Sequence, residues 1–194
     1  MGQINKASEI LNNARKPVFL AGGGVNIAHA NKEMTQLAEL SGVPVITTIM
    51  GKGAIPTTNS LYVGNIGIHG NYAANSAISN CDVLFSIGTR FNDRITGKIE
   101  EFAANAKIIH IDIDAASISR NIVVDVPIVA DAKKAICALL EKARSLDISE
   151  WTEEINRWKM EYLIDMGKAG LTPQMIIQSI NELFKDAIVA TDVG

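Results

Sequence analysis

The chain has 194 residues, of which 47% are apolar, 5% aromatic and 20% charged, a composition typical of a folded globular protein. It carries 18 basic and 21 acidic side chains, and no segment concentrates lysine and arginine. We therefore expect no nucleic-acid partner and no anionic-membrane partner. No apolar stretch is long enough to span a bilayer, and the first residues lack the apolar core of a signal peptide, so we expect a cytoplasmic location.

Cysteine and glycine are the informative residue types. Cys81 and Cys137 lie in apolar contexts without the spacing of a metal or redox site, so we expect two buried free thiols in a reducing compartment. Eleven of the 15 glycines fall between Gly22 and Gly97, and none falls between Lys98 and Met166. The first half of the chain therefore contains backbone that turns sharply or approaches something closely.

Helical and strand patterns alternate along most of the chain. Apolar spacing predicts a helix over 4–15, and the short apolar run 17–21 before three glycines predicts a buried parallel strand. The predicted elements that follow are a helix over 26–40, a strand over 44–48, a loop rich in Gly, Pro and Asn, a helix over 69–80, strands over 82–87, 107–113 and 122–129, and a helix over 131–144. This alternation predicts an α/β fold, a doubly wound and mainly parallel sheet of five or six strands in the order 3-2-1-4-5-6, with helices on both faces.

The pattern changes after residue 146. A charged helix is predicted over 149–166, with Trp151 and Trp158 seven residues apart on one face. Thr172 and Pro173 begin another helix, and 187–194 read as a strand that stops abruptly. We therefore expect an α/β domain over 1–146, a linker helix over 147–171, and the first α-β unit of a further, truncated domain over 172–194. The last segment is expected to be disordered, to dock on the first domain, or to pair with another copy through its exposed strand edge.

Ligands of open parallel sheets bind at the carboxyl ends of the strands. The predicted loops at those ends are rich in glycine and polar residues: Gly22–Gly24, Thr47–Thr48 with Met50–Lys52, Gly67–Gly70, Gly88–Arg94, Asp112–Asp114 and Ala130–Asp131. This predicts an extended ligand with phosphates and a ribose.

The glycine run at 22–24 has two interpretations. Its backbone N–H groups could approach a pyrophosphate, or the glycines could serve only a tight strand-to-helix turn. The third position of the usual dinucleotide fingerprint is Ile27, and the second strand ends in Thr47-Thr48 without a ribose-binding acid, which argues against standard NAD binding.

The charged residues at the strand ends also have two interpretations each. Arg90 and Arg94 could hold phosphate or a negatively charged ring edge through forked hydrogen bonds, with Asp93 orienting one of them. They could also belong to a solvated loop. Asp112 and Asp131 could bind ribose hydroxyls or an adenine amino group, although Asp131 could equally be a plain helix N-cap.

The histidines give weaker signals. His69 is a possible ring-contacting residue, whereas His29 and His110 are expected to be structural. The sequence contains no Ser-His-Asp or Cys-His arrangement, no metal-ligand spacing and no acid/base carboxylate pair. Spacing by itself thus predicts a nucleotide-binding module and indicates nothing about the reaction.

The segment Gly88–Gly97 resembles the G-x-R-F-D-D-R-V-T-G stretch of acetolactate synthase (acetohydroxyacid synthase) catalytic subunits. Other stretches fit the same family in the same order: Gly67–Gly70 with Ala74-Asn75, His110–Asp114, and Ala130-Asp131. The terminal segment Ala190–Gly194 is similar to the start of that family's C-terminal thiamine-diphosphate domain. Asn92 replaces the usual first Asp of the arginine motif, and Ile68 stands where Met is common.

The resemblance implies the six-stranded, FAD-binding central domain of a three-domain thiamine-diphosphate transferase. That enzyme condenses two pyruvates, or pyruvate and 2-oxobutyrate, in branched-chain amino-acid biosynthesis, and its flavin has no net redox role. Thiamine diphosphate and Mg²⁺ would be bound by the other domains of the same chain, and the full enzyme would be a homo-oligomer with a regulatory small subunit. This chain would therefore contain no catalytic residue and no metal ligand, and alone it would be inactive.

The resemblance also implies which residues bind the cofactor: Gly22, Gly23, Gly24, Thr48, Ile66, Gly67, Ile68, His69, Gly88, Thr89, Arg90, Asn92, Arg94, Ile95, Asp112, Ile113 and Asp131. Asp93 and Arg94 would also face the substrate channel. Three alternatives stay open: another FAD-containing thiamine-diphosphate enzyme such as glyoxylate carboligase or pyruvate oxidase, a redox domain like the electron-transfer flavoprotein α-subunit, and a bare nucleotide-binding module.

Overall fold

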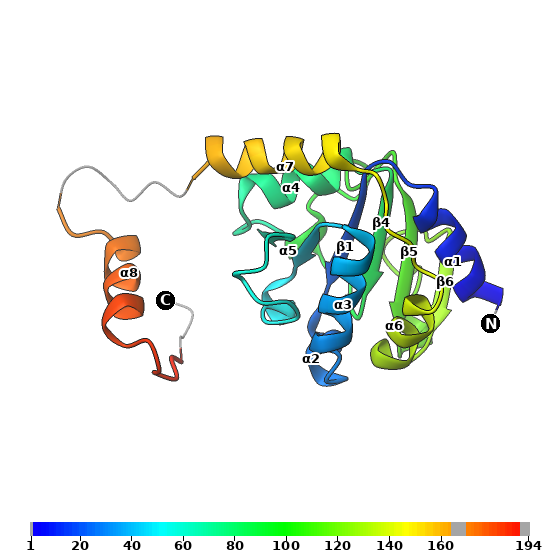
Figure 1. The fold of residues 1–194 in the computed structure, drawn as a ribbon, viewed down its shortest axis with the longest axis horizontal. Helices are drawn as coiled ribbons and strands as arrows, with labels where there is room; N and C mark the ends of the chain where they lie inside the picture. Colours follow the sequence, from blue (N-terminus) through cyan, green and yellow to red (C-terminus); the bar gives the residue numbers. More distant parts are fainter. Residues whose placement is uncertain (1, 164–169, 191–194) are drawn as a thin grey trace. The chain divides into compact units, whose positions relative to one another are not determined.

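The computed structural model describes residues 2–163 and 170–190. The chain divides into two compact units, Met1–Tyr162 and Leu163–Gly194, which are described separately. The first unit contains a sheet covered by helices (Figure 1). The second contains a single helix among its described residues.

The sheet has six strands, β1 (Pro17–Ala21), β2 (Val45–Thr47), β3 (Tyr62–Asn65), β4 (Val83–Ile87), β5 (Lys107–Asp112) and β6 (Val126–Val129). Their order is β3-β2-β1-β4-β5-β6, and every neighbouring pair is parallel. The predicted doubly wound order is therefore confirmed. The central strands β1 and β4 are buried along their whole length, as expected of strands covered on both faces.

The helices of the first unit are α1 (Gly2–Asn12), α2 (Gly23–Ile27), α3 (Asn31–Ser41), α4 (Tyr72–Asn80), α5 (Asp93–Thr96), α6 (Ala132–Leu140) and α7 (Ser149–Glu161), with short 3₁₀ turns η1 (Ile49–Gly51) and η2 (Ala115–Ser117). Helix α3 packs on α6, and α4 packs on α7 (Figure 1). Because right-handed crossovers lead from β1 to β2 on one side and from β3 to β4 on the other, α3 and α4 cover opposite faces. Helices therefore lie on both faces, as predicted.

Two predicted elements differ from the structure. Strand β3 lies inside the segment expected to be a loop. It contains Gly64 at φ +143° and shifts its register against β2. The segment therefore lacks the clear hydrophobic alternation that predicts a strand. The single helix expected over 26–40 is divided into α2 and α3, because His29 takes a left-handed φ of +50° between them.

Helix α7 belongs to the first unit. The Trp151 ring is buried and its Nε1–H donates to the carbonyl oxygen of Pro17 at 3.1 Å. Trp158 meets it edge-on with ring centroids 5.8 Å apart, which confirms the predicted shared face. Lys16 Nζ lies 4.9 Å from the Trp151 ring centroid and 2.8 Å from Glu154. The segment expected to link two domains is thus anchored at the start of β1.

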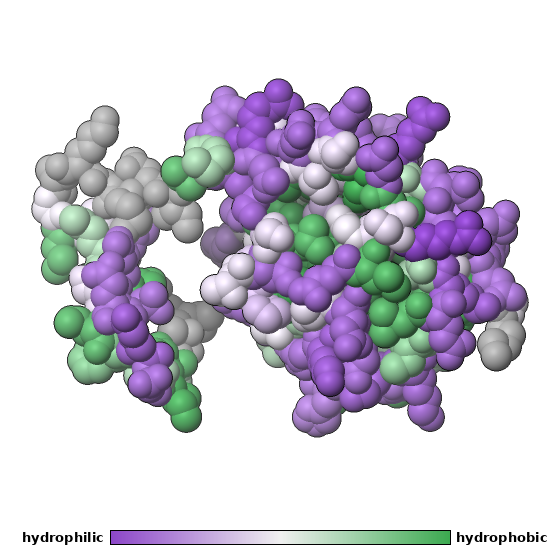
Figure 2. Space-filling view, in the orientation of Figure 1, coloured by the Kyte–Doolittle hydropathy of each residue, from purple (hydrophilic) through white to green (hydrophobic). Residues whose placement is uncertain are grey.

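The second unit contains α8 (Pro173–Leu183), whose N-cap is Thr172, as the Thr-Pro pair predicts. A terminal strand is expected over 187–194. Residues 187–190 form no strand, and 191–194 lie outside the described residues. Helix α8 buries none of its residues, and Figure 2 shows apolar side chains on its surface.

Candidate functional site

The parallel strands bring the predicted binding residues to one edge of the sheet, called the carboxyl edge below. All six strands end at this edge, so the residues that follow them converge. The residues that close or follow β1 to β6 are, in order, Gly22, Thr48, Ile66, Gly88, Asp112 and Asp131. The sequence-predicted loops are therefore neighbours in space.

The turns after β1 and β4 contact each other through their backbones. Gly24 N donates to Gly88 O at 3.0 Å, and a Cβ on Gly24 would lie 2.6 Å from Gly88 Cα. A Cβ on Gly22 would lie 2.2 Å from Gly88 O. Close contact between two turns thus explains these glycines, and Gly23 beside them stays half-buried. Because α2 has only five residues, its dipole adds little to anion binding.

The segment Gly88–Gly97, called the arginine loop, is held by its backbone. Gly88 N donates to Ile111 O at 2.8 Å. Four carbonyl oxygens of the loop accept hydrogen bonds from four different segments: Gly88 O from Gly24 N (3.0 Å), Thr89 O from His110 Nε2 (2.8 Å), Phe91 O from Asn121 Nδ2, and Arg94 O from Ile68 N (3.1 Å). The backbone that carries Arg90 and Arg94 is therefore fixed from several sides.

The guanidinium groups of Arg90 and Arg94 are exposed and form no hydrogen bond or ion pair with any residue of 2–163 or 170–190. Asp93 is exposed as well, and no ion pair joins it to either arginine in the same ranges, so the expected orienting role is not found. Two cations on a fixed backbone are suited to an anionic ligand because the ordering of that backbone is already complete before the ligand binds.

Asn92 starts α5. Its Oδ1 accepts a hydrogen bond from Ile95 N at 3.2 Å, which is an N-cap that an aspartate could form equally well. The departure from the family motif at this position therefore leaves the local backbone conformation intact.

The two aspartates of the carboxyl edge are both engaged with backbone. Asp131 caps α6 by accepting from Lys134 N at 3.0 Å, as its alternative interpretation predicts. Asp112 is buried, and its Oδ1 accepts from Asp114 N at 2.9 Å. A carboxylate has several lone pairs, so each could still accept a hydrogen bond from a ribose hydroxyl.

Exposed apolar side chains also gather around the carboxyl edge. Five residues in or beside its loops are between 68% and 81% exposed: Ile27, Ile49, Met50, Ile68 and Ile113. The sequence places Met50 in a ligand-side loop but assigns no ligand contact to Met50, Ile27 or Ile49, although apolar residues in glycine-rich loops after strand ends are a usable signal. Such side chains are suited to cover the faces of a planar ring system.

Asn26 and Asn31 attach the loop after β2 to the α2–α3 turn. Asn26 Nδ2 donates to Met50 O and Lys52 O, both at 3.0 Å, and Asn31 Nδ2 donates to Gly53 O at 2.7 Å. Thr48 Oγ1 accepts from Gly51 N at 3.0 Å, so this predicted site residue also shapes the loop. Sequence reasoning had given Asn26 and Asn31 no role beyond the expected helix.

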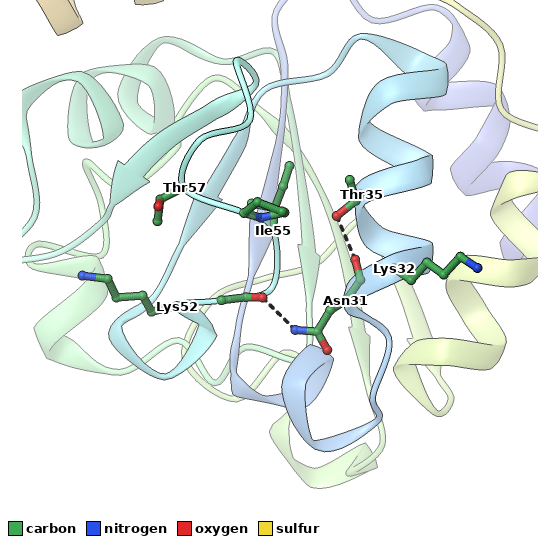
Figure 3. A pocket seen from close by; sticks show the side chains of 8 residues that line it. Asn31, Lys32, Thr35, Lys52, Ile55 and Thr57 are labelled. Carbon is green, nitrogen blue, oxygen red and sulfur yellow. Dashed lines mark hydrogen bonds between the residues drawn. The ribbon is translucent and has the colours of Figure 1, made fainter. Parts of the chain in front are cut away.

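A cavity of about 510 Å³ lies beside this loop and is lined by residues that include Asn31, Lys52 and Ile55. Figure 3 shows the side chains of Lys32 and Lys52 pointing away from each other. The cavity therefore gathers no pair of cations, and it is a less suitable anion site than the arginine loop.

Residues 4–139 match the family described as "Thiamine pyrophosphate enzyme, central domain". The chain belongs to this family. A protein of Methanocaldococcus jannaschii named "Probable acetolactate synthase large subunit" is 43% identical over 99% of this chain and 34% of its own length. Proteins named "Acetolactate synthase large subunit" from Cyanidium caldarium and Haemophilus influenzae are each 39% identical, over 99% and 100% of this chain and 34% and 35% of their own lengths. The chain thus spans about a third of the length of these relatives.

The histidines of this central domain have separate environments. His69 is exposed in the loop before α4, and His29 is exposed at the α2–α3 turn. His110 is fully buried on β5, and burial lowers the pKa of its ring below the ordinary value, against the opposing effects of the Thr89 carbonyl and Asp112. The structural role expected of His110 is confirmed, although its contact with the arginine loop was not foreseen.

The cysteines of the central domain are both free. Cys81 is buried, and burial raises the pKa of its thiol to about 12. Cys137 is exposed, contrary to the prediction, because α6 turns Ala135, Ile136 and Leu139 toward the core and Cys137 away from it. Within 2–163 and 170–190, no group of His, Cys, Asp or Glu side chains could hold a metal ion, and no helix is long and apolar enough to cross a membrane.

Proposed function

We propose that this chain is the FAD-binding central domain of an acetolactate synthase large subunit. The observation that carries the proposal is the arginine loop. Its two guanidinium groups have no partner among the described residues and stand on a fixed backbone among exposed apolar side chains. The names of the relatives support the choice of enzyme over glyoxylate carboligase and pyruvate oxidase. The full protein would condense two pyruvates to 2-acetolactate, or pyruvate and 2-oxobutyrate to 2-aceto-2-hydroxybutyrate.

The described residues fit the parts of FAD. Arg90 and Arg94 would bind its phosphates, Asp112 and Asp131 its ribose hydroxyls, and the apolar residues of the carboxyl edge its rings. The remaining members of the implied set, from Gly22 to Ile95, shape or line the same loops. FAD supplies no net electron transfer to this carboligation, so these residues bind and orient it, while Asp93 and Arg94 would also face the substrate channel.

The rest of the enzyme would lie outside this chain. We propose that further domains of the same polypeptide bind thiamine diphosphate and Mg²⁺, and that the complete protein is a cytoplasmic homo-oligomer with a regulatory small subunit. The chain alone would then show no acetolactate synthase activity. A gene that continues past residue 194 without a Gly-Asp-Gly…Asn diphosphate-binding segment would contradict this assignment and favour a redox flavoprotein.

The binding claim is tested by titrating the 194-residue chain with FAD and following flavin fluorescence. Arg90→Ala removes one guanidinium and should raise the dissociation constant about tenfold or more, because a charge-assisted hydrogen bond contributes roughly 1.5–3 kcal/mol. Arg144→Ala is the matched control. Arg144 is exposed after α6, and its backbone N–H bonds to Asn12 just before β1, at the opposite edge of the sheet.

Saturable binding that weakens in Arg90→Ala and not in Arg144→Ala supports the proposal. Equal affinities in both variants would exclude a role for Arg90. If the chain alone does not bind FAD, the same pair of variants in the full-length enzyme, scored by flavin retained after dialysis, decides the point.

A further inference from the structure

His110 contacts the arginine loop from inside the sheet. It lies on β5, is fully buried, and its Nε2 is 2.8 Å from the carbonyl oxygen of Thr89. A carbonyl oxygen only accepts hydrogen bonds, so Nε2 must carry the hydrogen in this contact. The ring also meets Phe91 of the same loop edge-on, with centroids 4.9 Å apart. His110 therefore touches the residues on both sides of Arg90.

The neutral Nε2–H tautomer is consistent with the other neighbours of the ring. Nδ1 is buried and has no hydrogen-bond partner among the described residues, so a proton there would be left unpaired. Asp112 Oδ2 lies 3.9 Å from Nε2, beyond hydrogen-bond distance. Thr89 O is thus the acceptor that decides which nitrogen carries the hydrogen.

Arg90 sits between two anchored carbonyl groups. Thr89 O is held by His110, and Phe91 O is held by Asn121. Asn121 is exposed and free to exchange its bond with water, whereas His110 is enclosed by the core. The anchor that solvent cannot replace is therefore the histidine.

We infer that His110 is the positioning residue of the arginine loop: through the Nε2–H bond to Thr89 O it fixes the backbone from which the Arg90 guanidinium reaches the ligand. Its importance for FAD rests on the proposed function. The fixing of the loop does not, and it can be measured without any ligand.

The first test uses trypsin on the intact, folded chain. Cleavage after Arg90 and Arg94 needs local opening of the loop, and cleavage after Arg144 serves as the internal reference. His110→Leu removes the donor and should raise cleavage in the loop about tenfold relative to Arg144. His110→Gln retains an N–H donor and should stay within about threefold of the original protein.

Ser86→Ala is the matched control variant. Ser86 pairs with His110 in the register of β4 and β5, and its hydroxyl is buried without a hydrogen-bond partner in the described part of the chain. Removing it changes the same layer of the core but no anchor of the loop, so loop cleavage should not rise. Equal increases at Arg90 and Arg144 in His110→Leu would mean general destabilisation and would overturn the inference.

The second test needs no substitution, so it stands even if His110→Leu does not fold. Long-range ¹H–¹⁵N NMR of the unsubstituted chain at neutral pH should show His110 with a protonated Nε2 and an unprotonated Nδ1. The opposite tautomer would refute the inference.

A final FAD titration separates the two claims. Weaker binding in His110→Leu, restored in His110→Gln, links the anchor to the ligand. If loop cleavage and tautomer are as expected but FAD does not bind, the proposed function fails while the positioning role stands. If FAD binds equally in both variants, the positioning role toward the ligand is wrong and the proposed function stands.

Discussion

Arg90 and Arg94 are exposed, but the backbone beneath them is not free to move. Hydrogen bonds to Gly88, Thr89, Phe91 and Arg94 tie the loop to several other segments of the fold. The entropy of ordering the loop is lost when the chain folds, so a ligand that binds there does not have to supply it again. The fold thereby prepares two cations at one edge of the sheet.

His110 makes the free energy of unfolding of the chain dependent on pH. Its pKa in the folded protein is lowered from the ordinary 6.5 by burial, so the unfolded chain binds a proton at a higher pH than the folded protein does. The free energy of unfolding should therefore fall as pH drops below about 6.5, by at most about 1.4 kcal/mol per pH unit from this group.

Urea unfolding between pH 7.5 and 5 measures this effect. At each pH, the free energy of unfolding of the unsubstituted chain is compared with that of His110→Gln, whose side chain at 110 cannot titrate. The difference should shrink as pH falls. A difference that is constant with pH would show that His110 takes up its proton equally in both states.

The contacts of helix α7, and not its charged composition, place it in the first unit. Its surface is charged, and only Trp151 and Ile155 are buried. The contacts of Trp151 with Pro17, Trp158 and Lys16 nevertheless attach it to the first unit. One large aromatic side chain can supply most of the energy that docks a helix of this kind.

Trp151→Ala should therefore lower the free energy of unfolding of the first unit by about 3–5 kcal/mol, the usual cost of removing a buried aromatic side chain. Trp151→Phe keeps much of the buried area but loses the bond to Pro17 O, so it should cost less. Urea midpoints of both variants test this. Little change in Trp151→Ala would mean that α7 is not docked.

The two units differ in how much apolar surface they bury. The first holds the whole hydrophobic core of the described residues, whereas α8 leaves Met175, Ile177 and Leu183 exposed. Every residue of that core lies in the first unit, so the first unit has a complete hydrophobic core of its own. The second unit should therefore be dispensable for folding of the first.

The free energy of unfolding of a chain that ends at Tyr162 should lie within about 0.5 kcal/mol of that of the 194-residue chain, because no core residue is removed. A chain that ends at Leu146 loses α7 and should be several kcal/mol less stable. Thermal and urea unfolding compare the three lengths. A large loss on removal of 163–194 would show that the second unit stabilises the first.

Sequence and structure agree where a pattern is strong and local. Buried strands such as β1 and β4, the Asp131 cap and the Trp151–Trp158 face follow from residue spacing and side-chain type, which act over a few residues. The order of the sheet follows from the handedness of crossovers. The sequence also located the glycine-rich loops of the carboxyl edge, because glycine and polar residues after apolar runs mark strand ends.

The remaining features depend on contacts between segments far apart in the sequence. β3 forms because β2 offers it an edge, Cys137 is exposed because of how α6 turns, and Trp151 draws α7 onto the start of β1. The sequence alone determined the parallel α/β fold, the glycine-rich loops of the carboxyl edge and the position of the two arginines in one of those loops. Only the tertiary structure decided that glycines 22 and 24 serve contact between two turns and that His110 holds the arginine loop, because hydrogen bonds and close packing depend on positions in space that no local pattern encodes.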